Sequence, residues 1–173
     1  MLWLTQQGHN VIGVELSPLA VRAFFAENGL HPHKRRAGKF TLWQSGRISI
    51  LCGDYFALRA ADIGIIDAVY DRAALTALPL DIRQLYITHL AEIVKPSSRI
   101  FLLTIEDAEA GDTLEQALAI DREIAALYAA THNIELAHIE TAVDLDPQPD
   151  SEGSLQRANY KVYRLSALDI STQ

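Results

Sequence analysis

The chain has 173 residues, 49% of them hydrophobic and 21% charged, and its formal net charge is −7. This length fits one domain with a substantial core, and the acidic balance argues against nucleic acid as a partner. No apolar run reaches the roughly 20 residues of a membrane helix, the N-terminus lacks the features of a signal peptide, and the single cysteine, Cys52, excludes an internal disulfide. We therefore expect a cytoplasmic protein that binds neither nucleic acid nor membranes, with a monomer as the favoured state.

Hydrophobic periodicity and turn residues predict an alternation of strands and helices. In chain order, we predict the second half of a helix closed by Gly8, a strand at 10–16, a helix begun by Ser17-Pro18, a basic loop at 30–39, and a hairpin at 40–44 and 47–51 (or one strand preceded by an extended arm). A connecting segment at 57–64, a strand at 65–70 and a helix capped by Asp81 follow, and then a strand at 99–105, a helix at 113–131, a strand at 134–143, a loop at 144–153 and a strand at 158–165. The predicted apolar face of the Asp81 helix consists of Leu85, Ile87, His89, Leu90 and Ile93.

This order is typical of an α/β fold in which a mostly parallel sheet carries helices on both faces. The last two strands follow each other without a helix between them, which predicts an antiparallel strand near one edge. Because the sequence shows no repeat and no long linker, we expect residues 1–173 to form a single domain.

Glu15 ends the first predicted strand. A carboxylate at such a strand end can accept hydrogen bonds from both hydroxyls of a ribose, because an ionised carboxylate is only an acceptor. The alternative is a carboxylate that is merely solvated. The helix that Ser17-Pro18 begin directly afterwards matches the nucleotide-binding arrangement and favours the ribose interpretation.

A second apolar strand ends in the string Cys52-Gly53-Asp54-Tyr55-Phe56. Gly53 would let the backbone approach a planar ring closely. Asp54 would accept a hydrogen bond from an exocyclic amine, and Tyr55 or Phe56 would cover one face of an adenine. The alternative is a turn aspartate followed by two core aromatics.

A third apolar strand ends in Asp71-Arg72. An arginine can hold a carboxylate through paired hydrogen bonds, so Arg72 would anchor the methionine end of a cofactor or an anionic substrate. The alternative is an Asp71–Arg72 surface ion pair of little energetic weight. Cys52 lies inside an apolar strand, where a structural thiol is commoner than a nucleophile, and no spacing of histidines indicates a metal site. These strand ends together indicate a nucleoside-binding crevice for S-adenosylmethionine.

Three segments of the sequence resemble the thiopurine S-methyltransferase family, and most closely its bacterial branch: residues 8–17, residues 46–49 leading to 52–56, and residues 70–79. The resemblance covers residues 1–105 well and the remainder loosely. It implies a Rossmann-like fold and methyl transfer from S-adenosylmethionine to a thiol or thione sulfur of a small aromatic or heterocyclic molecule. Selenium and tellurium compounds are further acceptors that the bacterial relatives suggest.

The same resemblance implies that Glu15 binds the ribose, that Asp54 and Tyr55 bind the adenine, and that Arg72 binds the cofactor or the substrate. It implies no covalent enzyme intermediate, no catalytic side chain and no metal. The family's substrate-lining residues have no counterpart in the segment 146–157, so the resemblance implies a substrate class and no particular substrate.

The family also places an aromatic-bearing arm, a first strand and a glycine-containing loop before the segment that aligns with Met1. We therefore expect an N-terminally incomplete domain without its central strand, which leaves an unpaired strand edge or lets the neighbouring strands close the gap. Two alternatives to the thiol methyltransferase follow: a non-catalytic remnant that binds the cofactor weakly or not at all, and a methyltransferase that acts on oxygen, nitrogen or a metalloid.

Overall fold

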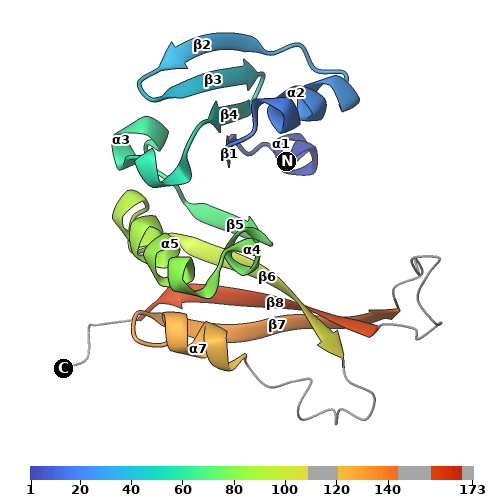
Figure 1. The fold of residues 1–173 in the computed structure, drawn as a ribbon, viewed down its shortest axis with the longest axis vertical. Helices are drawn as coiled ribbons and strands as arrows, with labels where there is room; N and C mark the ends of the chain where they lie inside the picture. Colours follow the sequence, from blue (N-terminus) through green and yellow to red (C-terminus); the bar gives the residue numbers. More distant parts are fainter. Residues whose placement is uncertain (109–120, 144–156, 169–173) are drawn as a thin grey trace. The chain divides into compact units, whose positions relative to one another are not determined.

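The computed structural model describes residues 1–108, 121–143 and 157–168. The chain separates into two compact units, Met1–Gly64 and Ile65–Gln173, and each contains its own four-stranded sheet (Figure 1). Within the described residues, no helix combines the length and the apolar character needed to cross a membrane.

The first unit is built on a sheet with the strand order β1-β4-β3-β2. Strands β1 and β4 run parallel, and the other neighbours run antiparallel. The core forms where α2 packs on this sheet: Val21 and Phe25 lie against Trp43, Ile48 and Ile50. The elements of the unit are α1 (Leu2–Gln6), β1 (Val11–Glu15), α2 (Pro18–Glu27), β2 (His33–Ala37), β3 (Phe40–Ser45), β4 (Ile48–Cys52), the 3-10 turn η1 (Tyr55–Ala57) and α3 (Ala60–Ile63).

Local sequence signals account for several boundaries of this unit. The Ser17 hydroxyl caps α2 by accepting a hydrogen bond from the Ala20 amide at 3.3 Å, and Pro18 fills the first turn, as predicted. Strands β3 and β4 form the predicted hairpin, with Gly46 at a φ of 56° in the turn. A left-handed turn residue of this kind matches the twist of a two-stranded ribbon, which favours a hairpin over an extended arm.

The basic segment 30–39, expected to be a loop, instead contains β2. Gly38 adopts a φ of 59°, which allows the chain to turn and pair β2 antiparallel with β3. The side chains of residues 33–36 are exposed, and the Lys34 ammonium lies 3.7 Å from the centroid of the Trp43 ring. This cation–π contact ties the strand to the hairpin, and the row of charges protects the sheet edge from pairing with other chains.

The second unit is built on a sheet with the strand order β5-β6-β8-β7. Strands β5 and β6 run parallel, whereas β8 is antiparallel to both β6 and β7. The described elements are β5 (Ala68–Arg72), α4 (Ala74–Ala77), α5 (Leu80–Ile93), β6 (Arg99–Ala108), α7 (Arg122–Tyr128), β7 (His132–Val143) and β8 (Arg157–Ala167).

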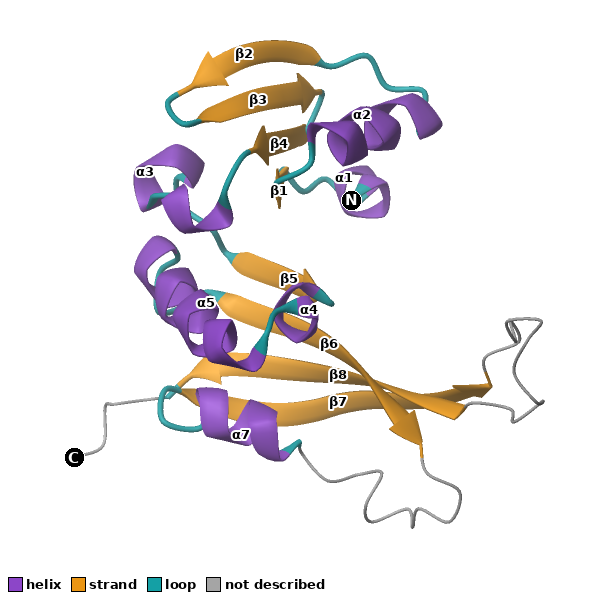
Figure 2. Cartoon of the chain, viewed as in Figure 1, coloured by secondary structure: helices purple, strands orange, loops and turns teal. Residues whose placement is uncertain are grey.

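Helices α5 and α7 contact the same face of this sheet. Asp71, Leu102 and Tyr163 occupy neighbouring register positions on β5, β6 and β8. Tyr86 of α5 donates a hydrogen bond to Asp71 at 2.9 Å, and the Asp121 amide, just before α7, donates to the Tyr163 hydroxyl at 3.3 Å. Figure 2 shows these helices, together with α4, in front of the sheet.

The expectation of one mostly parallel sheet is wrong, because the described strands form two mixed sheets. The tight β3–β4 turn and the position of β8 between β6 and β7 create antiparallel pairs in both. Strands β1 and β5 each lie at a sheet edge, and no described strand pairs with their outer sides.

Two helix predictions need correction. Asp81 does not cap α5, because the helix starts at Leu80 with Pro79 as its N-cap residue. Of the predicted apolar face of α5, Ile87, Leu90 and Ile93 are buried, together with Tyr86, whereas Leu85 is 58% exposed. Of the helix predicted at 113–131, the structure confirms α7; residues 113–120 lie outside the described residues, as does the loop predicted at 144–153.

Candidate functional site

The carboxylate of Glu15 is held at the end of β1. Its Oε1 atom accepts a hydrogen bond from the Ser17 amide at 2.7 Å, and the backbone carbonyl of Glu15 accepts one from the Gly53 amide at 3.0 Å. The residue is half-buried. Within the described part of the chain, its Oε2 atom has no hydrogen-bond donor, so one carboxylate oxygen is oriented and the other is available.

Asp54 lies at the end of β4 and caps the turn that follows. Its Oδ1 atom accepts a hydrogen bond from the Phe56 amide at 3.0 Å, and this bond starts the 3-10 turn η1. The rings of Tyr55 and Phe56 meet edge to face with their centroids 5.4 Å apart. Tyr55 is half-buried and Phe56 is 43% exposed, so the alternative of two core aromatics does not describe this pair.

The pairing of β1 with β4 brings Glu15 and Asp54 to the same edge of the sheet. The two strands are parallel, Glu15 is the register partner of Cys52, and Asp54 follows two residues later. Because parallel strands end at the same edge, ligands of open α/β sheets bind at such carboxyl ends. Two carboxylates and an aromatic pair therefore gather at one end of the first sheet.

The packing of the sheet explains why a glycine occupies position 53, which the sequence interpretation missed. A Cβ atom at this position would lie 2.6 Å from Cδ1 of the Phe40 ring, closer than real side chains come to one another. Phe40 itself is buried. The glycine is thus required by packing within the sheet, whether or not a ligand ring approaches it.

Cys52 is half-buried beside Glu15. Burial, and secondarily the negative charge of Glu15, raise the pKa of the Cys52 thiol. The thiolate, which is the nucleophilic form, is therefore disfavoured at neutral pH. This is the structural thiol that the sequence predicts.

Arg72 ends β5 in the second unit and is exposed. It forms no ion pair with Asp71, which points the other way: Asp71 is only 2% exposed and accepts hydrogen bonds from the Tyr86 hydroxyl and from the amides of Ala74 and Leu75. The alternative of an Asp71–Arg72 surface pair is therefore wrong. Within the described residues the Arg72 guanidinium has no hydrogen-bonding partner, so it is available to an anion.

Burial raises the pKa of Asp71, and the hydrogen bonds from Tyr86, Leu75 and Ala74 oppose that rise only in part. Tyr128 of α7 is fully buried nearby, and its pKa is raised by burial and then by the charge of Asp71. Alternation along β5 could have found this carboxylate, because Asp71 shares its side of the strand with Val69 whereas Tyr70 and Arg72 face the other way.

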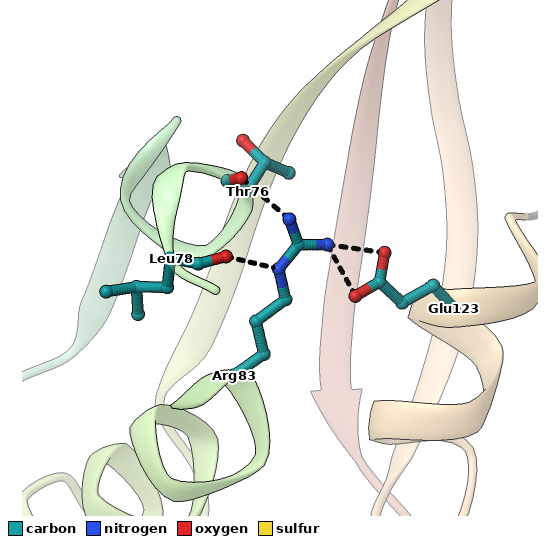
Figure 3. A network of polar contacts seen from close by, with 4 residues as sticks. All are labelled: Thr76, Leu78, Arg83 and Glu123. Carbon is teal, nitrogen blue, oxygen red and sulfur yellow. Dashed lines mark hydrogen bonds and ion pairs between the residues drawn. The ribbon is translucent and has the colours of Figure 1, made fainter. Parts of the chain in front are cut away.

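A further group that the sequence interpretation missed is the Arg83 network, shown in Figure 3. Arg83 of α5 donates hydrogen bonds to the carbonyl oxygens of Thr76 at 2.8 Å and Leu78 at 2.9 Å. Its Nη1 atom also bonds both carboxylate oxygens of Glu123 of α7, at 2.5 and 2.6 Å. Arg83 and Glu123 are 40 residues apart, and no local signal in the sequence links them.

Comparison with known proteins identifies the family. The family model described as thiopurine S-methyltransferase matches residues 1–167. A thiopurine S-methyltransferase of Stutzerimonas stutzeri is 60% identical over 166 residues, which cover 96% of this chain and 69% of that protein. One from Bordetella petrii is 39% identical over 165 residues, covering 95% of this chain and 75% of that protein.

Solved structures agree with the fold. A TehB-like S-adenosylmethionine-dependent methyltransferase from Corynebacterium glutamicum superimposes with a TM-score of 0.51 at 14% identity, covering 96% of this chain and 72% of that one. A protein whose structure is described under the conversion of a disulfide bond into a thioacetal group in echinomycin biosynthesis gives a TM-score of 0.53 at 17% identity, covering 95% and 70%. Identities this low establish the fold alone, but the family match spans both units. The chain therefore belongs to the thiopurine S-methyltransferase family of S-adenosylmethionine-dependent methyltransferases.

Proposed function

We propose that this protein transfers a methyl group from S-adenosylmethionine to a thiol or thione sulfur of a small aromatic or heterocyclic molecule. The observation that carries the proposal is the gathering of Glu15, Asp54 and the Tyr55–Phe56 pair at the ends of the parallel strands β1 and β4. The family match supports it independently.

The residues at these strand ends fit an adenosine. Glu15 would accept hydrogen bonds from the ribose hydroxyls, because its Oε1 atom is already oriented by the Ser17 amide. Asp54 would accept from the exocyclic amine of the adenine. Tyr55, with Phe56 against it, would cover the face of the ring, and the exposed aromatic surface of Phe56 is the kind that a ligand buries.

S-Adenosylmethionine, when bound, supplies an activated methyl group on a positively charged sulfur. The protein's task is then to hold and align the acceptor sulfur, and such alignment alone can supply much of the rate enhancement. The acceptor reacts as its thiolate, so an acceptor with a low pKa needs little help from a general base. Cys52 keeps its proton and takes no part.

Arg72 is the proposed anion-binding residue of the second unit. Its guanidinium is exposed and can bind a carboxylate in the two-pronged manner that planar arginine favours. The carboxylate would be that of the methionine end of the cofactor or that of an anionic substrate. Selenium and tellurium species are further candidate acceptors in their selenolate and tellurolate forms, since these anions share the soft nucleophilic character of a thiolate.

We also propose that residues 1–173 act as one methyltransferase domain. The support is that a single family model spans residues 1–167 and so includes both units. We place the protein in the reducing cytoplasm, where a free thiol such as Cys52 persists. The rival function is a non-catalytic remnant; the observation in its favour is that the described strands form two separate sheets.

Calorimetric titration with S-adenosylhomocysteine tests the proposal. We expect micromolar binding, about −8 kcal/mol, and at least a tenfold loss in Glu15→Ala. The matched control is Glu27→Ala, which removes an exposed carboxylate from the end of α2 in the same unit. Equal losses in both variants would remove Glu15 from the site, and no binding by the unaltered protein would favour the remnant.

A panel of methyl acceptors then decides the substrate class. We expect methyl transfer to aromatic thiols and little to phenols, amines or metalloid oxyanions. Faster transfer to one of the other classes, with cofactor binding intact, would leave a methyltransferase but overturn its assignment to sulfur.

A further inference from the structure

The single helical turn α4 is held at both ends by charged side chains. Four residues are too few to form a stable helix on their own. At the start, Asp71 Oδ1 accepts hydrogen bonds from the amides of Ala74 at 3.1 Å and Leu75 at 3.3 Å. At the end, Arg83 donates to the carbonyl oxygens of Thr76 and Leu78. The two side chains thus satisfy backbone groups that a helix leaves unpaired at its ends.

Both anchors depend on one face of α5. Arg83 is a residue of this helix, and Tyr86, three positions later, donates its hydroxyl hydrogen to Oδ2 of Asp71 at 2.9 Å. Residues at this spacing lie side by side on a helix surface. Glu123 of α7 fixes the Arg83 guanidinium from the far side (Figure 3), and only 15% of the Arg83 side chain is exposed. Hydrogen bonds between ions are stronger than neutral ones, so this arrangement is rigid.

Arg72 lies directly before the turn that these contacts hold. Ala73, which links it to α4, has a φ of 62° and is the only described residue other than glycine with a positive φ. This conformation costs free energy in any residue with a Cβ atom, and it persists only where the surrounding structure imposes it. On one side β5 is paired with β6; on the other side α4 is held by Asp71 and Arg83. Arg72 is itself the last residue of β5 and is paired with Leu103 of β6. If α4 were released, Ala73 could return to a negative φ, and this last pair of the strand would loosen.

We propose that Arg83 is a positioning residue for the methyl transfer: by holding α4 it imposes the left-handed conformation of Ala73 and so keeps Arg72 in its place at the end of β5. The inference rests on the proposed role of Arg72 and extends it, because it names the residue that makes that role possible. Arg83 is nearly enclosed by its partners, so it acts through the backbone of α4 and not by contact with a ligand.

The test combines hydrogen exchange with a double-mutant cycle. Arg83→Gln, Arg72→Gln and the double variant are compared in the full chain, with 2-mercaptobenzoate as an aromatic thiol that carries a carboxylate. Arg164→Gln is the matched control, because it removes another arginine–glutamate pair of the second unit, one that is exposed on both sides and 3.4 Å long. Arg83→Lys serves as a second variant that keeps the charge opposite Glu123 but loses the planar fork.

We expect Arg83→Gln to speed amide exchange at residues 74–77 at least tenfold and to lower kcat/KM about tenfold. In the Arg72→Gln background the same change should lower kcat/KM no further, because the residue through which it acts is gone. Arg83→Lys should change amide exchange and kcat/KM in the same directions but by smaller factors, and Arg164→Gln should change neither.

Unchanged exchange in Arg83→Gln, or an equal fall of kcat/KM in both backgrounds, would overturn the inference. An Arg72→Gln variant as active as the unaltered protein would instead overturn the proposed role of Arg72, and the inference with it, even if exchange at α4 responds as expected. The exchange data and the cycle therefore tell the two failures apart.

Discussion

Replacing Tyr86 with phenylalanine should destabilise the second unit in a pH-dependent way. Tyr86 is 8% exposed and Asp71 is 2% exposed, and the hydroxyl of the first donates to the carboxylate of the second at 2.9 Å. Phenylalanine keeps the ring, so no sizeable cavity forms. Losing a hydrogen bond to a charged, buried acceptor costs about 1.5–3 kcal/mol, whereas a neutral one costs about 1 kcal/mol.

The direction of the pH dependence follows from the pKa of Asp71, which burial raises above its ordinary value of 3.8. The protonated form of Asp71 therefore stabilises the folded state. This contribution is fully present below pH 3.8 and is lost as the pH rises through the raised pKa. The Tyr86 bond lowers that pKa, so its removal penalises the ionised form most. We expect Tyr86→Phe to lower the free energy of unfolding by about 1.5–3 kcal/mol at neutral pH, and by about 1 kcal/mol where Asp71 is protonated.

The assay must report on the second unit. Both tryptophans, Trp3 and Trp43, belong to the first unit, so intrinsic fluorescence would follow the wrong transition. Hydrogen exchange of peptides from α5 and β6, measured in urea between pH 4 and 8, gives the local free energy of opening. Tyr160→Phe, at an exposed position of β8, is the control. A loss of stability that is independent of pH, or one below about 0.5 kcal/mol at neutral pH, would show that the Tyr86 hydroxyl does not stabilise an ionised Asp71.

Three further predictions concern the first unit. Gly53→Ala should lower its stability by about 1–3 kcal/mol, because the new Cβ would meet the Phe40 ring at 2.6 Å; Phe40→Leu in the same chain should recover part of this loss in urea unfolding, and full additivity would contradict the clash. Because the pKa of Cys52 is raised, iodoacetamide should alkylate this thiol more slowly at pH 8 than it alkylates free cysteine, and the rate should still rise above pH 9. A rate that reaches its plateau at or below pH 8 would contradict the raised pKa. Lys34→Ala should cost about 0.5–1 kcal/mol and alter the fluorescence of Trp43; an unchanged spectrum would show that the cation does not rest on the ring.

Much of the candidate site could be predicted because its signals are local. The β-branched run before Glu15, followed at once by a Ser-Pro helix start, defines both the strand and its end. The string from Cys52 to Phe56 likewise defines the end of β4 and the turn that follows it. Each side chain lies at a strand end because of its immediate neighbours, and the parallel pairing of two such strands then places Glu15 and Asp54 together.

The failures arose where distant segments decide the outcome. Whether β8 pairs with β6 or extends a parallel sheet depends on residues some 60 positions away in sequence, such as Tyr163 opposite Leu102. Leu85 fits the apolar stripe of α5 in the sequence, but the buried face of the helix contains Tyr86 and leaves Leu85 exposed. The basic run of β2 gives no strand pattern of its own and is paired because the turn at Gly38 presents it to β3. Such contacts leave no local trace in the sequence.

A crystal structure of the protein with S-adenosylhomocysteine would show whether the ends of β1 and β4 bind the adenosine. We expect the carboxylate of Glu15 within hydrogen-bonding distance of both ribose hydroxyls, and the carboxylate of Asp54 at the exocyclic amine of the same adenosine. An adenosine bound away from the ends of β1 and β4, touching neither carboxylate, would contradict it.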